Sequence, residues 1–333
     1  MNAPIIPLFV FIFATLIPVD LILGEEPGAP RFSKPEVIYY EFGLKITSNG
    51  QSSGILGTVP VPIEWPEQKV EFIEQRKSDS LKNISFKKLG KNIRQMVIKA
   101  NRLEPGEVAE GTVVLKIKKC HIQTPEDTSN LVIAKKIPGS IRQYLKPSPY
   151  IESNHRTIKK LVKKIPLPHN LSDWKRIETI YQWVRDNIEY KFDEQIHSCL
   201  TALESGQGDC EELSSLFIAI CRAQGIPARA VWIPGHTYPE FYLEDKNGNG
   251  YWFPCQAAGT YQFGEMEESR PILQKGDRFK LPGNPKTLRY VQPSLVAKEA
   301  TAGLSIEFIA RQVTDEFESG SLSSKVPSSG KTQ

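Results

Sequence analysis

The sequence predicts an α+β protein in which an N-terminal antiparallel β-sandwich precedes a region of helices and strands. Two patterns support this prediction. From about residue 35 to residue 125, apolar and polar residues alternate in short runs separated by turn sequences. From residue 172 onward, apolar residues recur with helical spacing, and short strand-like runs follow. A length of 333 residues is sufficient for two domains of ordinary size.

Composition is that of a folded globular protein, with 40% hydrophobic and 24% charged residues. The formal net charge of +4 is small for this length. It gives no reason to expect nucleic acid or an anionic membrane surface as a partner, and we expect neither. After the first 24 residues no apolar run is long enough for a membrane span, so we expect no integral membrane core.

The N-terminal stretch "MNAPIIPLFVFIFATLIPVDLILGEEPGAP" contains an apolar run from Ile5 to Pro18. This length is typical of the apolar region of a signal peptide. We therefore predict a signal peptide over residues 1–24, a linker over 25–34, and an exported protein that is periplasmic, envelope-bound or secreted. An uncleaved N-terminal anchor and an unusual cytoplasmic N-terminus are the competing interpretations.

Residues 35–141 are assigned to the β-sandwich. The runs "GTVPVPIEW", "IRQMVIKA" and "GTVVLKIKKCHI" are strand-like, and "KLGKN" and "LEPGE" are turns between them. This region contains no constellation of catalytic residue types. We interpret it as a scaffold or recognition module.

Two amphipathic helices are predicted in the core region, which we assign to residues 142–293. The first lies in "SDWKRIETIYQWVRDNIEY", with Ser172 or Asp173 as its N-cap. The second follows Asp209 as N-cap and ends at Gly225, beyond which Pro227 prevents continuation. The apolar stripe of the first helix comprises Trp174, Ile177, Ile180, Tyr181, Val184 and Ile188, and that of the second comprises Leu213, Leu216, Phe217, Ile220 and Cys221.

Strands are predicted after the second helix at "RAVWI", "EFYLED" and "GYWFP". The last two are joined by "KNGNG", a strong hairpin signal. Beyond the core, we predict a helical C-terminal extension over residues 294–315. Residues 316–333 are rich in Ser, Gly and Lys and are predicted to be disordered.

The five cysteines are too few and too scattered for a disulfide scaffold. No CxxC pair occurs, and the five histidines do not cluster with the cysteines, so we predict no metal site and no cofactor. Cys221 and Cys255 are expected in the core, and His197 and Cys199 in a surface loop. Tyr190 is expected on the approach to the loop that precedes Cys210.

Cys210 stands in the first turn of the second predicted helix, in "GQGDCEELSS". The positive end of the helix dipole and the unpaired N–H groups there favour a thiolate, which is the nucleophilic form of cysteine. The neighbouring residues Asp209, Glu211 and Glu212 oppose this effect through their negative charges. A histidinium partner would be needed to offset them.

Two further residues complete a candidate triad. His236 follows a glycine at the entrance of a predicted strand, 26 residues after Cys210. Gln256 stands near the end of the strand "GYWFPCQ", 20 residues after His236. One helix and its neighbouring strands could bring these side chains together, with Gln256 orienting the imidazole.

These pieces resemble the transglutaminase-like superfamily, whose core is a papain-like cysteine-hydrolase fold. The matching segments are "YQWVRDNIEY", "GQGDCEELSSLFIAICRAQGIPARAV", "GHTYPEFYL" and "GYWFPCQ". The chain is also similar to exported bacterial members in which a β-sandwich precedes the core. The resemblance implies that Cys210 is the nucleophile and His236 the general base.

The third catalytic position departs from the family pattern. The resemblance implies an Asp four residues after Trp252, where this chain has Gln256. A glutamine can accept a hydrogen bond from the imidazole and fix its tautomer, but it supplies no negative charge. Glu240, four residues after His236, is another carboxylate near the site, on the same face of the strand.

The leading hypothesis is an enzyme that cleaves protein or peptide amide bonds through a thioester on Cys210, with water or an amine as the acceptor. The alternative is a catalytically weak or inactive binding protein that retains the fold, because Gln256 replaces the usual Asp. A third interpretation makes Cys210 a redox-sensing thiol that Cys221 or Cys255 resolves.

Overall fold

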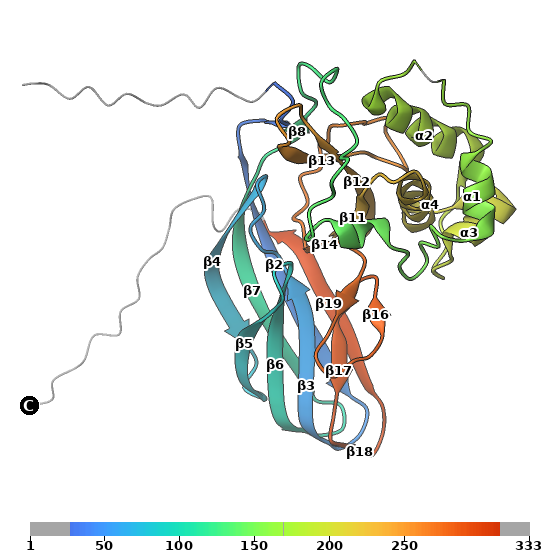
Figure 1. The fold of residues 1–333 in the computed structure, drawn as a ribbon. Coiled ribbons are helices and arrows are strands. Elements are labelled where there is room, and N and C mark those ends of the chain that lie inside the picture. The colour runs from blue at the N-terminus through green and yellow to red at the C-terminus, as the bar shows by residue number, and fades with distance from the viewer. Residues whose placement is uncertain (1–26, 169, 314–333) are drawn as a thin grey trace, which may run out of the picture.

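The computed structural model describes residues 27–168 and 170–313 as an elongated β-sandwich with a helix-and-strand domain at one end (Figure 1). The predicted signal peptide and the predicted disordered tail lie outside these residues. Within the described residues, no helix combines the length and apolarity that a membrane crossing requires. The α+β class and the order of the two regions are as the sequence predicts.

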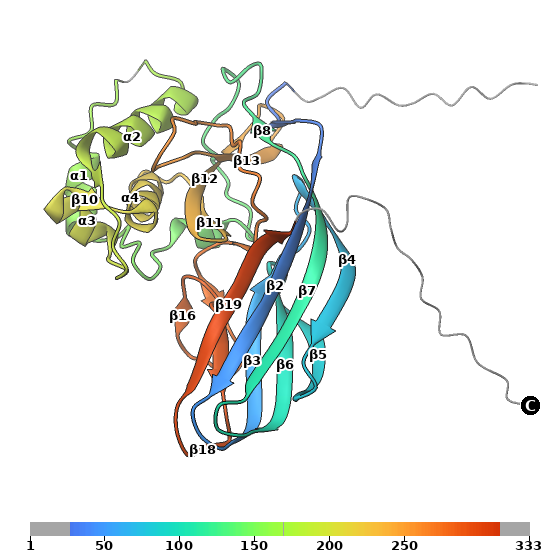
Figure 2. The same ribbon diagram turned by 180° about the vertical axis from the view of Figure 1, so that it is seen from behind.

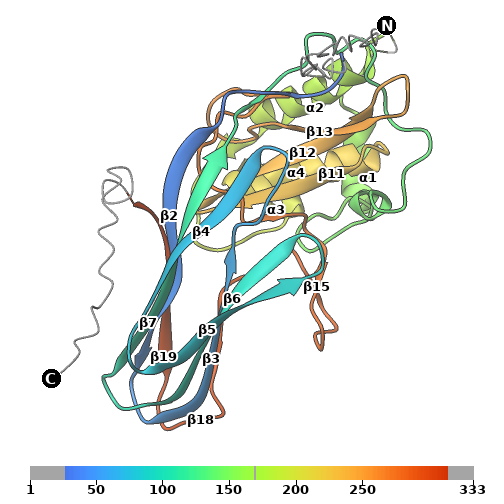
Figure 3. The same cartoon turned by 90° about the vertical axis from the view of Figure 1, so that its left-hand side faces the viewer.

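Two antiparallel sheets form the sandwich, and Figure 3 shows them as facing layers. The first sheet has the order β19 (Leu304–Val313), β2 (Glu36–Ser48), β7 (Val108–Lys119) and β4 (Gln68–Lys77). The second has the order β17 (Ser294–Val296), β3 (Ser52–Val61), β6 (Ile93–Leu103) and β5 (Leu81–Leu89), and β18 (Glu299–Ala300) also pairs with β3. Alternate residues of both sheets, among them Phe42, Val59 and Met96, fill the space between the layers.

The helix predicted over residues 294–315 is wrong. Leu304–Val313 forms strand β19, which pairs with β2 along its whole length and lies beside it in Figure 2. Leu304, Phe308 and Ala310 alternate along the strand and pack against the sandwich core. These apolar residues therefore follow the two-residue period of a strand. Hydrogen bonding to the open edge of β2 stabilises the strand over a helix.

The boundary between the two domains also differs from the prediction. Leu131 and Ile133 pack in the core of the helix-and-strand domain, so this domain begins before residue 142. Within the predicted linker, β1 (Arg31–Phe32) pairs with β8 (Ile122–Gln123). The second domain is thus inserted between β8 and β17, and the chain returns to the sandwich after it.

The central element of the second domain is α4, which lies between the other helices and a sheet (Figure 1). The helical elements are η1 (Arg142–Leu145), α1 (Arg156–Val162), α2 (Asp173–Asn187), α3 (Cys199–Ser205) and α4 (Cys210–Ala223). The sheet has the order β13 (Gly250–Pro254), β12 (His236–Glu244), β11 (Ala228–Ile233) and β14 (Gln274–Lys275). Short pairs are formed by β9 (Glu189–Tyr190) with β10 (Gln207–Gly208) and by β15 (Phe279–Lys280) with β16 (Thr287–Leu288).

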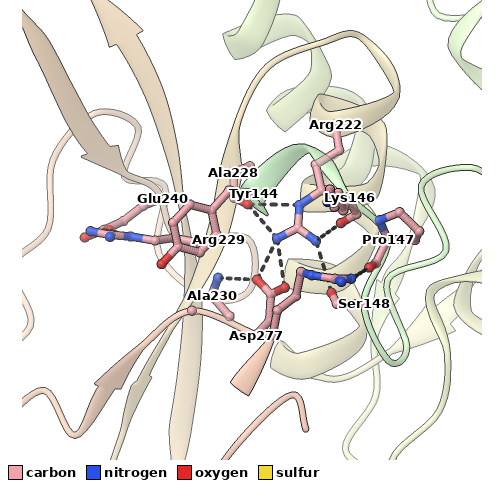
Figure 4. A network of polar contacts seen from close by, with 12 residues as sticks. Tyr144, Lys146, Pro147, Ser148, Arg222, Ala228, Arg229, Ala230, Glu240 and Asp277 are labelled. Atoms are coloured by element: carbon pink, nitrogen blue, oxygen red, sulfur yellow. Dashed lines mark hydrogen bonds and ion pairs between the residues drawn. The ribbon is translucent and has the colours of Figure 1, made fainter. Parts of the chain in front are cut away.

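A buried polar network fixes the C-terminal end of α4 (Figure 4). The Arg222 guanidinium donates to both carboxylate oxygens of Asp277, at 2.7 and 2.8 Å, and to the Ala228 carbonyl. It also donates to the Lys146 carbonyl and the Ser148 hydroxyl. Because both charges are fully buried, their mutual bonds offset a large desolvation cost and hold α4 in one position.

Candidate active site

The turn before Cys210 joins α3 to α4 through two glycines with different roles. Gly206 caps α3 with a φ of 71°, a left-handed conformation that glycine adopts without a steric penalty. Gly208 lies so close to α4 that an added Cβ would stand 2.7 Å from the Cβ of Glu212. These two positions allow a short, close entry into the nucleophile helix.

The start of α4 carries the capping box that places Cys210 at the first helical position. The Asp209 carboxylate accepts from the Glu211 N–H, and the Glu212 carboxylate accepts from the Asp209 N–H at 2.9 Å. The other Glu212 oxygen accepts from the His197 N–H at 2.8 Å. The prediction that Asp209 is the N-cap is confirmed, and the Glu212 carboxylate has a structural role.

Cys210 is half-buried at the point where α4 meets β12. The Thr237 N–H donates a hydrogen bond to its sulfur, which places the thiol beside the residue that follows His236. Burial raises the thiol pKa to about 11, and the nearby carboxylates, first that of Asp209, add to this effect. The bond from Thr237 lowers the pKa but does not cancel these contributions. At neutral pH the thiol is therefore protonated.

His236 and Gln256 are brought together. Nε2 of His236 lies 2.8 Å from Oε1 of Gln256, and a neutral imidazole donates its Nε2–H to this amide oxygen. Nδ1 then carries the free lone pair. Burial lowers the pKa of His236, while the bond to Gln256 opposes this shift. The nearby Arg270 lowers the pKa further, and Glu268 raises it.

Helix α2 holds the backbone of Gln256 in place. The Gln256 carbonyl accepts from the Tyr181 hydroxyl at 3.0 Å and from Nη1 of Arg185 at 2.9 Å. Arg185 also donates to the Gly259 carbonyl, and the Gln256 N–H donates to the Gln262 carbonyl. Sequence analysis missed Arg185, because an arginine in the last turn of a helix is typical of a solvated position that complements the helix dipole.

Glu240 does not orient the imidazole. Its side chain is buried, and its carboxylate binds Arg229 at 2.7 Å and Lys275 at 2.5 Å. Burial opposes its ionisation, yet these two cations hold the pKa of Glu240 below its usual value. The residue belongs to a structural charge cluster behind β12.

A cleft of about 520 Å³ opens beside His236. Apolar side chains, among them Ile188, Leu213 and Ala258, form most of its lining. Tyr190, which is 55% exposed, stands at its edge, on the strand that pairs with β10 just before Cys210. A cleft of this size and lining suits a small, largely apolar group.

The other cysteines lie elsewhere. Cys199 was expected in a surface loop, but it is buried at the start of α3 and donates to Glu152 at 3.0 Å, because that face of α3 packs against α4. Cys221 and Cys255 are buried in the core, as predicted. Cys221 lies about 16 Å along α4 from Cys210, too far for a disulfide. Among the described residues, no group of three or more His, Cys, Asp or Glu side chains could hold a metal ion.

Comparison with known proteins finds matches for part of this chain. The family model of the transglutaminase-like superfamily matches residues 159–257. An uncharacterized protein of Haemophilus influenzae is 31% identical over 102 residues, which are 28% of this chain and 26% of the relative. The chain thus matches about a quarter of the length of this curated relative.

Solved structures show the likeness of the fold. A putative cysteine protease from Cytophaga hutchinsonii matches with a TM-score of 0.56 and 15% identity, covering 86% of this chain and 94% of that one. A putative protease from Parabacteroides distasonis covers 70% and 71% at 11% identity, with a TM-score of 0.24 that supports no conclusion. The chain therefore contains a transglutaminase-like superfamily domain at residues 159–257, and this domain carries Cys210, His236 and Gln256.

Proposed function

We propose that this protein is a cysteine enzyme that cleaves peptide or protein amide bonds through a thioester intermediate. The observation that carries the proposal is the bond from His236 Nε2 to Gln256, which leaves Nδ1 as a proton acceptor. His236 is followed by Thr237, whose N–H binds the Cys210 sulfur. Cys210 is then the nucleophile, His236 the general base, and Gln256 the residue that fixes the tautomer of the imidazole.

The first half-reaction forms the thioester. The Cys210 sulfur bonds to the amide carbonyl carbon while His236 Nδ1 accepts the thiol proton, and the carbonyl oxygen becomes an oxyanion. The Cys210 N–H, in the first turn of α4, has no intrahelical partner and is a donor for that oxyanion. When the carbon–nitrogen bond breaks, His236 returns the proton to the departing amine.

The second half-reaction releases the acyl group. Water or an amine attacks the thioester carbonyl, and His236 accepts a proton from this nucleophile. The Cys210 sulfur leaves and regains a proton from His236. With water the products are those of a peptidase, amidase or deamidase, and with an amine the product is a cross-linked amide.

A second candidate function is a non-catalytic peptide-binding protein. The neutral side chain of Gln256 gives no charge stabilisation to an imidazolium, and the pKa of the Cys210 thiol is raised rather than lowered. Both features weaken catalysis while leaving the apolar cleft beside His236 intact.

Turnover of a panel of fluorogenic peptide amides, and of glutamine peptides with a fluorescent primary amine, tests the proposal. We expect turnover by the unmodified protein and its loss in Cys210→Ser and His236→Ala. The matched control is Cys120→Ser, at a partly buried cysteine directly after β7 of the sandwich, and it should not change turnover. Absence of turnover by the unmodified protein, together with turnover by Gln256→Asp, would favour the binding protein. Turnover that survives Cys210→Ser would contradict the proposed mechanism.

A further inference from the structure

Two adjoining cavities lie where the sandwich meets the second domain, away from the cleft beside His236. One of about 420 Å³ lies between the β5–β6 turn, η1 and residues 276–280. The other, of about 570 Å³, continues along the sandwich and shares Gly90, Lys91 and Ile93 with the first. The cations that line them and carry the argument below, together called the basic seam, are Lys88, Lys91, Arg94, Arg278 and Lys280.

The charged side chains that line these cavities are mostly cations. The lining of the first cavity includes Lys91, Arg278 and Lys280, together with Arg229, and no carboxylate. The lining of the second includes one carboxylate, Glu64, which lies 3.7 Å from the Lys69 ammonium.

The cations of the basic seam are also unpaired. Over residues 27–168 and 170–313, none of the five forms an ion pair with Asp or Glu, whereas Arg270 and Arg289 beside the active site both do. Five neighbouring cations without counterions create a positive potential that favours an anionic ligand.

Buried charges behind the seam do not neutralise it. Three buried cations, Lys119, Arg229 and Lys275, lie near two buried carboxylates, Glu67 and Glu240. A third carboxylate that acts on Lys119, that of Glu268, is already paired with Arg270. Burial lowers the pKa of Lys119 to about 8, so this lysine is still mostly charged at neutral pH. The Asp277 carboxylate is fully engaged by Arg222 (Figure 4).

The seam is held in a fixed shape. The Asn92 amide donates to the Lys275 carbonyl at 3.2 Å and to the Tyr144 hydroxyl at 3.4 Å, which ties the β5–β6 turn to the second domain. The Arg278 guanidinium donates to the Pro147 carbonyl. A ligand would therefore meet cations whose supporting backbone is already ordered, which reduces the entropy lost on binding.

The lining selects among anionic ligands. Aliphatic residues, among them Ile63, Val70 and Ile141, line the cavities together with the cations. The aromatic rings of the first cavity, Tyr144 and Phe279, are 4% and 8% exposed and offer no platform on which a base or sugar ring could stack. Carboxylates interleaved with apolar groups, as in an acidic polypeptide, match this lining better than a nucleic acid does.

We propose that the basic seam binds an acidic polypeptide segment, with Lys91, Arg278 and Lys280 contacting its carboxylates. Arg222, at the last turn of α4, lies beside the seam, whereas Cys210 is at the first turn, about 18 Å along the helix axis. Binding is therefore independent of the thiol chemistry, and it does not require that the protein be an enzyme.

Fluorescence anisotropy with a labelled 12-residue peptide of alternating Glu and Leu tests this site. The full chain is used in a Cys210→Ser background, so the result does not depend on the proposed catalysis. We expect saturable, salt-sensitive binding that weakens about ten-fold or more in Lys91→Glu/Lys280→Glu. The neutral pair Lys91→Gln/Lys280→Gln should weaken it less, and thermal unfolding verifies that each variant is folded.

The matched control is Lys159→Glu/Lys160→Glu, an identical charge change at exposed lysines of α1 that form no ion pair in the described part of the chain. It should retain binding within about two-fold. Equal weakening in both charge-reversed variants, or equal binding of a Lys-Leu peptide, would overturn the proposal. Tighter binding of a DNA oligonucleotide or a sulfated polysaccharide of matched charge would overturn the assignment to a polypeptide.

Discussion

At the scale of single residues, the candidate site combines a histidine whose pKa is lowered with a cysteine whose pKa is raised. Burial raises the pKa of Cys210 to about 11 and lowers that of His236. The resting pair is therefore neutral thiol and neutral imidazole. The proton must move to His236 during the attack on the substrate, rather than beforehand.

This resting state predicts how alkylation of Cys210 depends on pH. Only the thiolate reacts with iodoacetamide, and below a pKa of about 11 the thiolate fraction rises about ten-fold per pH unit. We expect the rate of labelling at Cys210 to increase steadily from pH 7 to pH 9.5, as measured by mass spectrometry of the labelled peptide. A plateau that begins near or below pH 7 would indicate a thiolate–imidazolium pair instead.

Asp209→Asn should make Cys210 more reactive. The Asp209 charge raises the pKa of the thiol, and an asparagine still accepts the cap bond from Glu211. We expect iodoacetamide labelling of Cys210 at pH 8 to become about two- to five-fold faster. The matched control is Glu204→Gln, an equal loss of charge at an exposed position of α3. Unchanged or slower labelling in Asp209→Asn would contradict this account of the thiol.

At the scale of elements, helix α2 acts as a support for the strand end that carries Gln256. Two of its side chains, Tyr181 and Arg185, bind the same backbone carbonyl. The Arg185 guanidinium also stacks on the Tyr181 ring, with Cζ of Arg185 5.4 Å from the ring centre. The helix therefore fixes the residue that orients the imidazole, and Arg185 also lines the cleft beside His236.

Arg185→Met tests this positioning role. The variant keeps the helix but loses the bonds to the Gln256 and Gly259 carbonyls, so Gln256 is held less firmly. If the protein turns over a substrate, we expect kcat to fall about 10- to 100-fold with a smaller change in KM. Arg176→Met is on the same helix, and among the described residues Arg176 forms an ion pair with Asp173 alone, so this variant should change kcat little. A change confined to KM would assign Arg185 to substrate binding instead.

The sequence was sufficient to locate the elements whose signals are local. Asp209 caps α4, Ser172 caps α2, and Gly225 follows the last turn of α4, all as their residue types predict. The pairing of His236 with Gln256 could also be anticipated, because both stand at the ends of neighbouring strands. Strand β19 could not, since its partner β2 lies more than 250 residues earlier and its apolar residues fit either a helix or a strand.

At the scale of the whole molecule, buried charges join the two domains. The Lys275 ammonium, on β14 of the second domain, lies 2.5 Å from Glu67 of the sandwich and 2.5 Å from Glu240 of β12. Each of the three side chains is nearly inaccessible to solvent. No sequence pattern indicates that Lys275 and Glu67, 208 residues apart, would meet, because isolated charged residues are typical of the surface.

Lys275→Met tests whether this cluster couples the folding of the two domains. The substitution leaves Glu67 buried without its bonded cation, whereas Glu240 keeps Arg229. Removing one partner of a buried pair costs about 3–5 kcal/mol, and we expect a loss of this size in the free energy of unfolding measured with urea.

The double variant Glu67→Gln/Lys275→Met removes the uncompensated charge and should recover part of the loss. The control Lys69→Met removes an exposed pair with Glu64 and should cost less than about 1 kcal/mol. If Lys275→Met unfolds at the same urea concentration as the unmodified protein, the cluster does not stabilise the junction. If it instead separates unfolding into two transitions, the charges are what makes the two domains unfold as one unit.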